Sequence, residues 1–107
     1  MTHQNPDTLA MLRPGYLKRL KERLAILTAT LAATAGRAQS KAEAEESHRL
    51  VHSMGSSAAI YGYQALSDAA RAAEKLYDDH ASAPADRVAA LKRLAEEARL
   101  VVGKETP

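Results

Sequence analysis

Apolar residues recur along this chain at intervals of three and four positions, the spacing that places them on one face of an α-helix. The clearest series consists of the leucines Leu17, Leu20, Leu24, Leu27 and Leu31. It predicts a long helix from Pro14 to about Ala35, with Gly36 as its stop. Residues 8–12 form a shorter apolar segment before Pro14, and we expect them to make a separate short helix that Asp7 caps.

Turn and cap residues divide the rest of the chain into three further predicted helices. Ser40 and Glu43 have the spacing of a capping box, in which each residue satisfies a free backbone N–H of the first turn. The expected bounds are 40–61, then 64–79, then from Pro84 to a frayed end that Gly103 and Pro107 mark, with Gly62 and residues 80–84 as connections. The expected inner positions of the last two helices are Leu66, Ala69, Ala70, Ala73, Leu76, Tyr77, Val88, Leu91, Leu94 or Ala95, Ala98 and Val101.

The composition agrees with a helical chain throughout. Cysteine, tryptophan and phenylalanine are absent from the 107 residues, while alanine and leucine, the strongest apolar helix formers, supply much of the apolar content. Short links place successive helices side by side in opposite directions. We therefore expect an all-α fold, with residues 1–107 as one domain: an antiparallel up-down-up-down four-helix bundle with a short extra N-terminal helix. Without cysteine, a disulfide framework and a thiolate metal site are excluded.

Charge and hydropathy argue against nucleic acid and membrane partners. The net charge is +2, and the basic cluster in residues 13–23 lacks the recognition motif or stacking aromatics that nucleic-acid binding requires. Residues 18–38 look like a signal peptide, but the leucine series keeps one helical register through the basic and the apolar half. No apolar run is long enough to span a bilayer. We expect a cytoplasmic monomer.

One face of the predicted helix at 40–61 carries small side chains around a histidine. On a helical wheel, the apolar positions fall in one arc that contains Leu50, Val51, Met54, Ala58 and Tyr61. His52 lies roughly 150° from the centre of that arc, and the outer residues around it are His48, Gly55, Ser56 and Ala59. A mid-helix glycine costs about 1 kcal/mol relative to alanine. We therefore interpret the low surface as clearance for a large partner that approaches His52.

Three other interpretations of this face stay open at this point. His52 could be an ordinary polar surface residue, and the small side chains could accept a helix of a second copy. His48 and His52 are one helical turn apart and could share a metal ion with a third ligand. Arg49 follows His48, so the glutamate of a His-Glu-x-x-His motif is missing. The other histidines, His3 and His80, lie near a terminus and in a predicted loop.

The stretch around His52 resembles the motif of histidine-containing phosphotransfer (Hpt) domains, which act in bacterial two-component phosphorelays. That motif has a histidine, any residue, an aliphatic residue, often a lysine, a small residue, and a glycine ten positions after the histidine. The sequence reads His52-Ser53-Met54-Gly55-Ser56-Ser57, with Gly62 at the tenth position. The family's third-helix pattern follows at Leu66, Ala69, Ala70, Ala73 and Glu74. The strong match covers residues 47–76.

The resemblance implies that His52 is the phosphoacceptor and that Nε2 takes the phosphoryl group. A docked receiver domain would supply the acidic pocket, the Mg²⁺ and the donor or acceptor Asp. We therefore expect no cofactor on this chain, no metal site, and a phosphorelay intermediate rather than an enzyme. The expected partners are response-regulator receiver domains and a hybrid histidine kinase. The expected docking surface consists of His48, Arg49, Gly55, Ser56 and Ala59.

Two positions depart from the family pattern. Gly55 stands where a lysine often helps with the phosphoryl charge, and Ser56 stands at the usual glycine. Arg49 and Arg71 are candidates for supplying that charge in this chain. A runner-up function from another class is a helical adaptor that binds receivers or kinases without being phosphorylated. Acid-labile, base-stable phosphate on the protein would distinguish the two.

Overall fold

The computed structural model describes residues 6–105 and contains four α-helices and no strand within that range. These are α1 (Pro6–Ala33), α2 (Lys41–Ile60), α3 (Gln64–Asp78) and α4 (Pro84–Glu105). The predicted all-α class is therefore confirmed. His3 and the predicted end at Pro107 lie outside the described residues. Within 6–105, no helix has the length and apolar character needed to cross a membrane.

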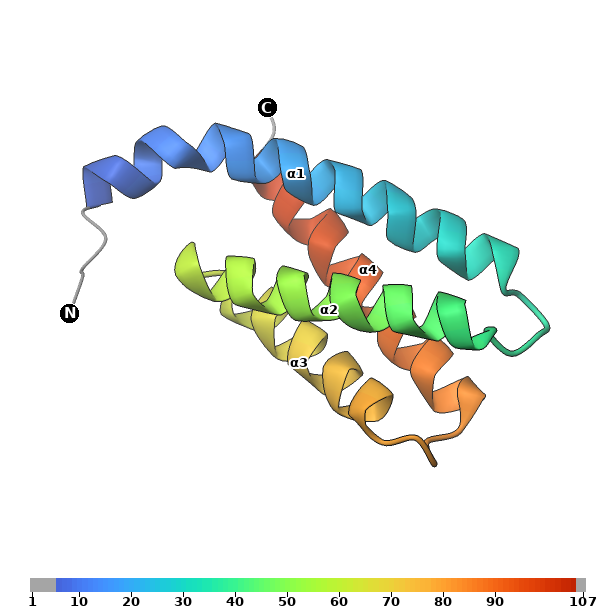
Figure 1. Cartoon of the computed structure of the whole chain (residues 1–107). Helices are drawn as coiled ribbons and strands as arrows, with labels where there is room; N and C mark the ends of the chain where they lie inside the picture. Colours follow the sequence, from blue (N-terminus) through green and yellow to red (C-terminus); the bar gives the residue numbers. More distant parts are fainter. Residues whose placement is uncertain (1–5, 106–107) are drawn as a thin grey trace.

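The helices pack mainly with their neighbours in sequence, and α4 also packs against α1. Figure 1 shows the chain returning along α2 after α1, then reversing again into α3 and into α4. The contact between α2 and α3 is the most extensive, and the contact between α1 and α2 is the slightest. Among the described helices, α3 therefore packs most closely on α2.

The core lies where the apolar faces of all four helices meet. Leu20 and Leu27 of the leucine series are fully buried, and the other three leucines of the series pack against them partly buried. The remaining buried apolar residues are Tyr16, Val51, Met54, Ala58, Leu66, Ala69, Ala70, Ala73, Tyr77, Leu91, Leu94, Ala95 and Ala98. Many of these positions are alanines, and small side chains let helix backbones approach one another closely.

The predicted short N-terminal helix is wrong, because α1 continues through Pro14 as a single helix. A proline has a φ angle that suits a helix, and it removes one backbone hydrogen bond without forcing the chain out of the helix. The first turns of α1 lie at an angle to the rest of the helix in Figure 1, as an internal proline allows. Asp7 lies within the first turn rather than at the cap. The predicted fraying at Gly103 is also wrong, since α4 extends to Glu105.

Gly36, in the turn that follows α1, and Gly62, directly after the C-cap of α2, adopt the left-handed conformation, with φ angles of 76° and 80°. After α2, the N–H of Tyr63 donates to the carbonyl of Ala58 at 2.9 Å and the N–H of Gly62 donates to that of Ala59 at 3.2 Å. This pair of bonds is a Schellman motif, which satisfies the last carbonyls of the helix. The glycine ten positions after His52 thus has a structural role as the helix stop.

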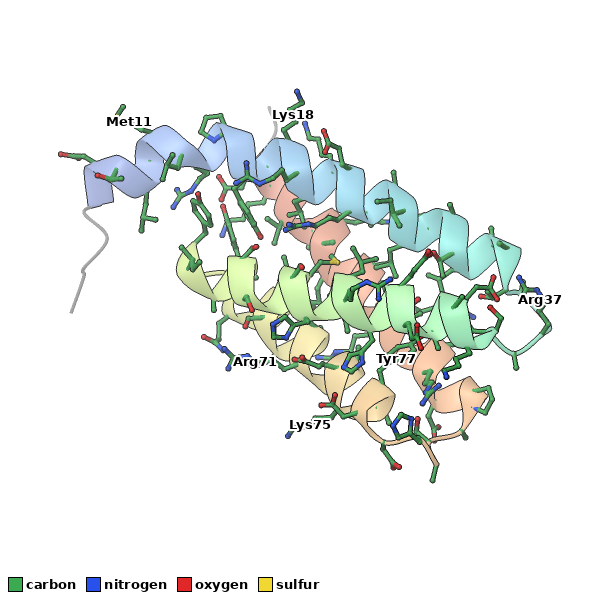
Figure 2. The ribbon with its side chains drawn as sticks, in the orientation of Figure 1. Met11, Lys18, Arg37, Arg71, Lys75 and Tyr77 are labelled. Carbon is green, nitrogen blue, oxygen red and sulfur yellow. The ribbon has the colours of Figure 1, made fainter. Side chains whose placement is uncertain are left out.

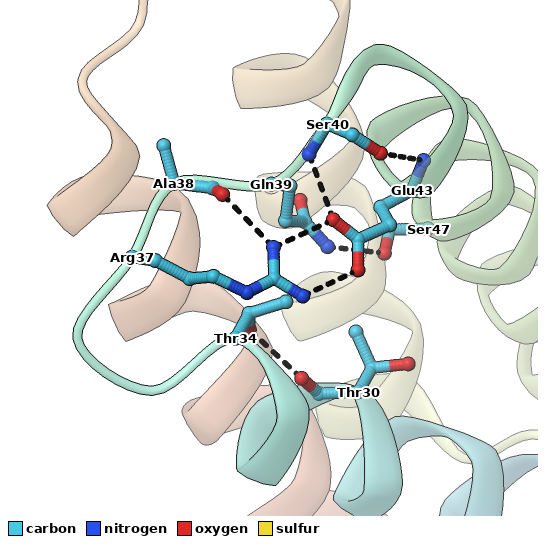
Figure 3. A network of polar contacts seen from close by, with 8 residues as sticks. All are labelled: Thr30, Thr34, Arg37, Ala38, Gln39, Ser40, Glu43 and Ser47. Atoms are coloured by element: carbon cyan, nitrogen blue, oxygen red, sulfur yellow. Dashed lines mark hydrogen bonds and ion pairs between the residues drawn. The ribbon is translucent and has the colours of Figure 1, made fainter.

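The predicted capping box at the start of α2 is confirmed (Figure 3). The Ser40 hydroxyl accepts the Glu43 N–H at 3.2 Å, and the Glu43 carboxylate accepts the Ser40 N–H at 2.8 Å. Arg37 forms a bidentate ion pair with the same carboxylate, with both N–O distances at 2.8 Å. The Arg37 guanidinium and the Ser40 backbone N–H lower the pKa of Glu43 from 4.5 to about 2. The connection between α1 and α2 is therefore held by charge-assisted bonds.

Candidate functional site

His52 projects from the outer face of α2, opposite the buried side chains of Val51 and Met54 on the helix's inner side. Its side chain is 65% exposed, in agreement with the helical wheel. Its Nδ1 lies 2.5 Å from a carboxylate oxygen of Glu74, which comes from α3. The imidazole is therefore held from one side by the neighbouring helix while most of the ring faces solvent.

The contact with Glu74 determines which ring nitrogen of His52 is free. An ionised carboxylate only accepts hydrogen bonds, so the neutral ring carries its proton on Nδ1 and donates it to Glu74. The other nitrogen, Nε2, then keeps its lone pair. A histidine in this tautomer, fixed in orientation by a second group, is arranged to act as a nucleophile through Nε2.

His48 forms a second and similar pair one turn earlier. Its Nε2 lies 2.7 Å from a carboxylate oxygen of Asp78, and its ring stacks at 6.1 Å on that of Tyr77, which Figure 2 labels. Its side chain is 37% exposed. His48 therefore lies at the edge of the face, as predicted, but its Nε2 is occupied, unlike that of His52.

The two pairs lie along the line where α2 meets α3, which we call the α2–α3 seam. His48, His52, Glu74 and Asp78 are at least partly exposed along this seam, and Gly55, which lies next to Arg71, is buried in it. Two histidines four residues apart on one helix face two carboxylates four residues apart on the next. This matched spacing is visible in the sequence once α2 and α3 are taken as neighbours that run in opposite directions. Sequence reasoning noted Glu74 only as part of the family pattern and missed its contact with His52.

A shallow hollow of about 380 Å³ lies beside the exposed ring. Its lining residues are His48, Arg49, His52, Ser53 and Glu74. Arg49, Ser56 and Ala59 are exposed, as the predicted docking surface requires. Within residues 6–105, no group of three or more histidine, aspartate or glutamate side chains is placed to hold a metal ion.

The predicted place of Gly55 on the docking surface is wrong, because Gly55 is buried against α3. A Cβ at this position would lie 3.3 Å from the Cβ of Ala70 and 3.7 Å from the Cγ of Arg71. The Ser67 hydroxyl, itself buried, donates a hydrogen bond to the Gly55 carbonyl at 3.1 Å. The glycine therefore lets α2 and α3 approach closely, and the low outer surface beside His52 consists of Ser56 and Ala59.

A family model of the Hpt domain matches residues 12–101 of the chain. The chain belongs to the Hpt domain family. Hpt domains are phosphotransfer intermediates of two-component signalling, and they interact with receiver domains and kinases in phosphorelays. The match extends over all four helices of this Hpt domain, well beyond the motif around His52. Comparisons with curated proteins and with solved structures gave no match.

Proposed function

We propose that His52 of this Hpt domain accepts a phosphoryl group from the phosphorylated aspartate of one receiver domain and relays it to the aspartate of another. The observation that carries this proposal is the contact of Nδ1 with Glu74, which leaves Nε2 free on a ring that is 65% exposed. His48 is the obvious rival, but its Nε2 is engaged by Asp78. Membership of the Hpt family supports the class of reaction.

The geometry suits the charge changes of this transfer. The Nε2 lone pair forms the N–P bond as the bond between phosphorus and the aspartyl oxygen breaks, and that bond's electron pair stays on the aspartate. The ring thereby becomes positively charged while Nδ1 keeps its proton. The carboxylate of Glu74, at 2.5 Å from Nδ1, offsets this positive charge. Transfer to the second receiver reverses these steps.

The rest of the reaction machinery is expected from the receiver. Phosphoryl transfer depends mainly on in-line positioning and on charge stabilisation, and we propose that the receiver brings Mg²⁺ and its acidic pocket to the surface around His52. His48, Arg49, Ser56 and Ala59 would form the contact, since they surround the ring and the last three are exposed. We further propose that the chain acts as a cytoplasmic monomer, folded as an antiparallel bundle, with a hybrid histidine kinase upstream.

The proposal is tested by mixing the protein with a receiver that carries labelled aspartyl phosphate. We expect label on the wild type, none on His52→Gln, and label on His48→Gln, which is the matched control because it removes the other seam histidine. The bound phosphate should be labile in acid and stable in base. Label on His52→Gln at the wild-type level would show that the assignment is wrong. A wild type that binds the receiver without taking label would instead be the non-phosphorylated adaptor.

A further inference from the structure

Small buried residues set the distance between α2 and α3 beside His52. Gly55 is buried on α2, and Ser67, Ala70 and Ala73 are buried on α3. A Cβ at position 55 would lie 3.3 Å from the Cβ of Ala70, so α3 occupies the space that a side chain would need there. Glycine permits such a close approach because it has no Cβ. The two helices therefore meet most tightly about one turn after His52.

The hydroxyl of Ser67 holds the two helices together at this point. Its side chain is fully buried, and it donates a hydrogen bond across to the Gly55 carbonyl at 3.1 Å. A serine or threonine inside a helix often bonds a carbonyl of its own helix instead, as Thr34 does with the carbonyl of Thr30 at 2.8 Å. A carbonyl oxygen has two lone pairs, so Gly55 can accept the bond from α3 in addition to a bond within α2. Ser67 thus ties α3 to the backbone of α2.

Glu74 lies on the same face of α3 as Ser67. Seven residues separate them, which amounts to two helical turns, about 10 Å along the axis and roughly 20° in direction. On α2, Gly55 and His52 are three residues apart and lie within one turn. Because a helix is stiff over this length, the separation and rotation that α3 has at Ser67 also determine where Glu74 meets His52.

The contact between Glu74 and His52 tolerates little change in that separation. The carboxylate oxygen lies 2.5 Å from Nδ1, and hydrogen bonds to nitrogen extend to about 3.2 Å. An outward shift of α3 by about 1 Å would therefore weaken or break the bond that orients the imidazole. Misplacing a reacting group by about 1 Å can lower a rate by as much as 10²-fold.

We propose that Ser67 is a positioning residue for phosphoryl transfer at His52. Its bond to the Gly55 carbonyl keeps α3 close enough to α2 for Glu74 to hold the Nδ1 proton and leave Nε2 free. The inference rests on the proposed phosphorylation of His52. Gly55 serves the same purpose by leaving room for α3. Ser67 acts only through Glu74, because it is fully buried and is out of reach of a docked receiver.

The test compares two substitutions in the seam with two matched controls. Ser67→Ala removes the hydroxyl without adding bulk, and Thr34→Val removes a buried hydroxyl that bonds its own helix, far along α1. Gly55→Ala adds a Cβ against α3, and Gly103→Ala adds one on α4 where no atom lies within 4 Å. Nitrogen NMR reports the tautomer of His52, labelled receiver phosphate reports the rate of uptake, and circular dichroism confirms that each variant is folded.

We expect Ser67→Ala and Gly55→Ala to increase the share of the Nε2–H tautomer of His52. The rate of phosphoryl uptake should fall about fivefold in each, which is less than the loss expected when Glu74 itself is removed. Both controls should match the wild type. In a Glu74→Ala background, Ser67→Ala should slow uptake no further, because a residue that acts through Glu74 has no effect without it.

An unchanged tautomer in folded Ser67→Ala overturns the inference. Equal slowing by Ser67→Ala with and without Glu74 also overturns it, since the hydroxyl would then act on general packing rather than on the orientation of His52. A wild type that takes no label at His52 refutes the proposed function itself. The tautomer comparison would still decide, in that case, whether Ser67 positions Glu74.

Discussion

The buried position of Gly55 makes a sharp prediction for the stability of the fold. A Cβ at 55 would lie 3.3 Å from the Ala70 Cβ, a little inside the optimal carbon–carbon separation of about 3.5–4.0 Å. Alanine adds only that atom, and its better helix propensity, worth about 1 kcal/mol, offsets the crowding. Leucine adds three more carbons at a filled helix–helix contact, where overpacking costs about 1–3 kcal/mol or more.

We therefore expect Gly55→Leu to lower the free energy of unfolding by about 2 kcal/mol, after the gain in helix propensity is subtracted from the upper part of that range. For a domain of this size, the melting temperature should fall by roughly 10 °C. The matched control is Ser56→Leu, on the next residue of the same helix, which is exposed and should stay within about 0.5 kcal/mol of wild type.

The assay is urea unfolding followed by the helical circular dichroism signal, with the slope of the transition compared among variants. An unchanged slope with a lower midpoint would mean that stability alone has changed. If Gly55→Leu unfolds at the same urea concentration as Ser56→Leu, then α3 does not pack on Gly55. The reasoning that removes this glycine from the docking surface would then be refuted.

Two other predictions concern single carboxylates. Glu74→Ala should move the neutral His52 ring from the Nδ1–H toward the Nε2–H tautomer, which nitrogen NMR spectra would detect. Because a hydrogen bond to a charged group is lost, the rate of phosphoryl uptake should also fall about tenfold or more. An unchanged tautomer in Glu74→Ala would contradict the role assigned to Glu74. Glu43 has a folded pKa of about 2 against an ordinary 4.5, so its ionised form stabilises the fold above about pH 4.5 and this contribution is lost as the pH falls toward 2. Glu43→Gln should therefore lose less stability than wild type between pH 5 and pH 2 in thermal melts, and parallel curves would show that the Arg37 pair contributes nothing.

Much of the local structure follows from signals within a few residues. The leucine spacing, the Ser40–Glu43 capping box and the glycines at 36 and 62 predict where helices lie, start and stop, and the structure agrees to within a few residues at most ends. Pro14 is the exception. A proline sets local preferences, but the helix can continue past it at the loss of one backbone hydrogen bond, and the sequence around it does not reveal which outcome prevails.

The sequence by itself determined the exposure of His52, because the apolar arc of α2 must face the core and a residue on the opposite side must face solvent. Only the tertiary structure decided what surrounds that ring. Glu74 is 22 residues away in sequence, and Gly55 appears exposed on a lone helix but is covered once α3 packs on it. Both facts depend on how α2 and α3 meet, which helical periodicity does not specify. The exposed histidine was thus visible in one helix, while the carboxylate that orients its ring became visible only from the packing of two.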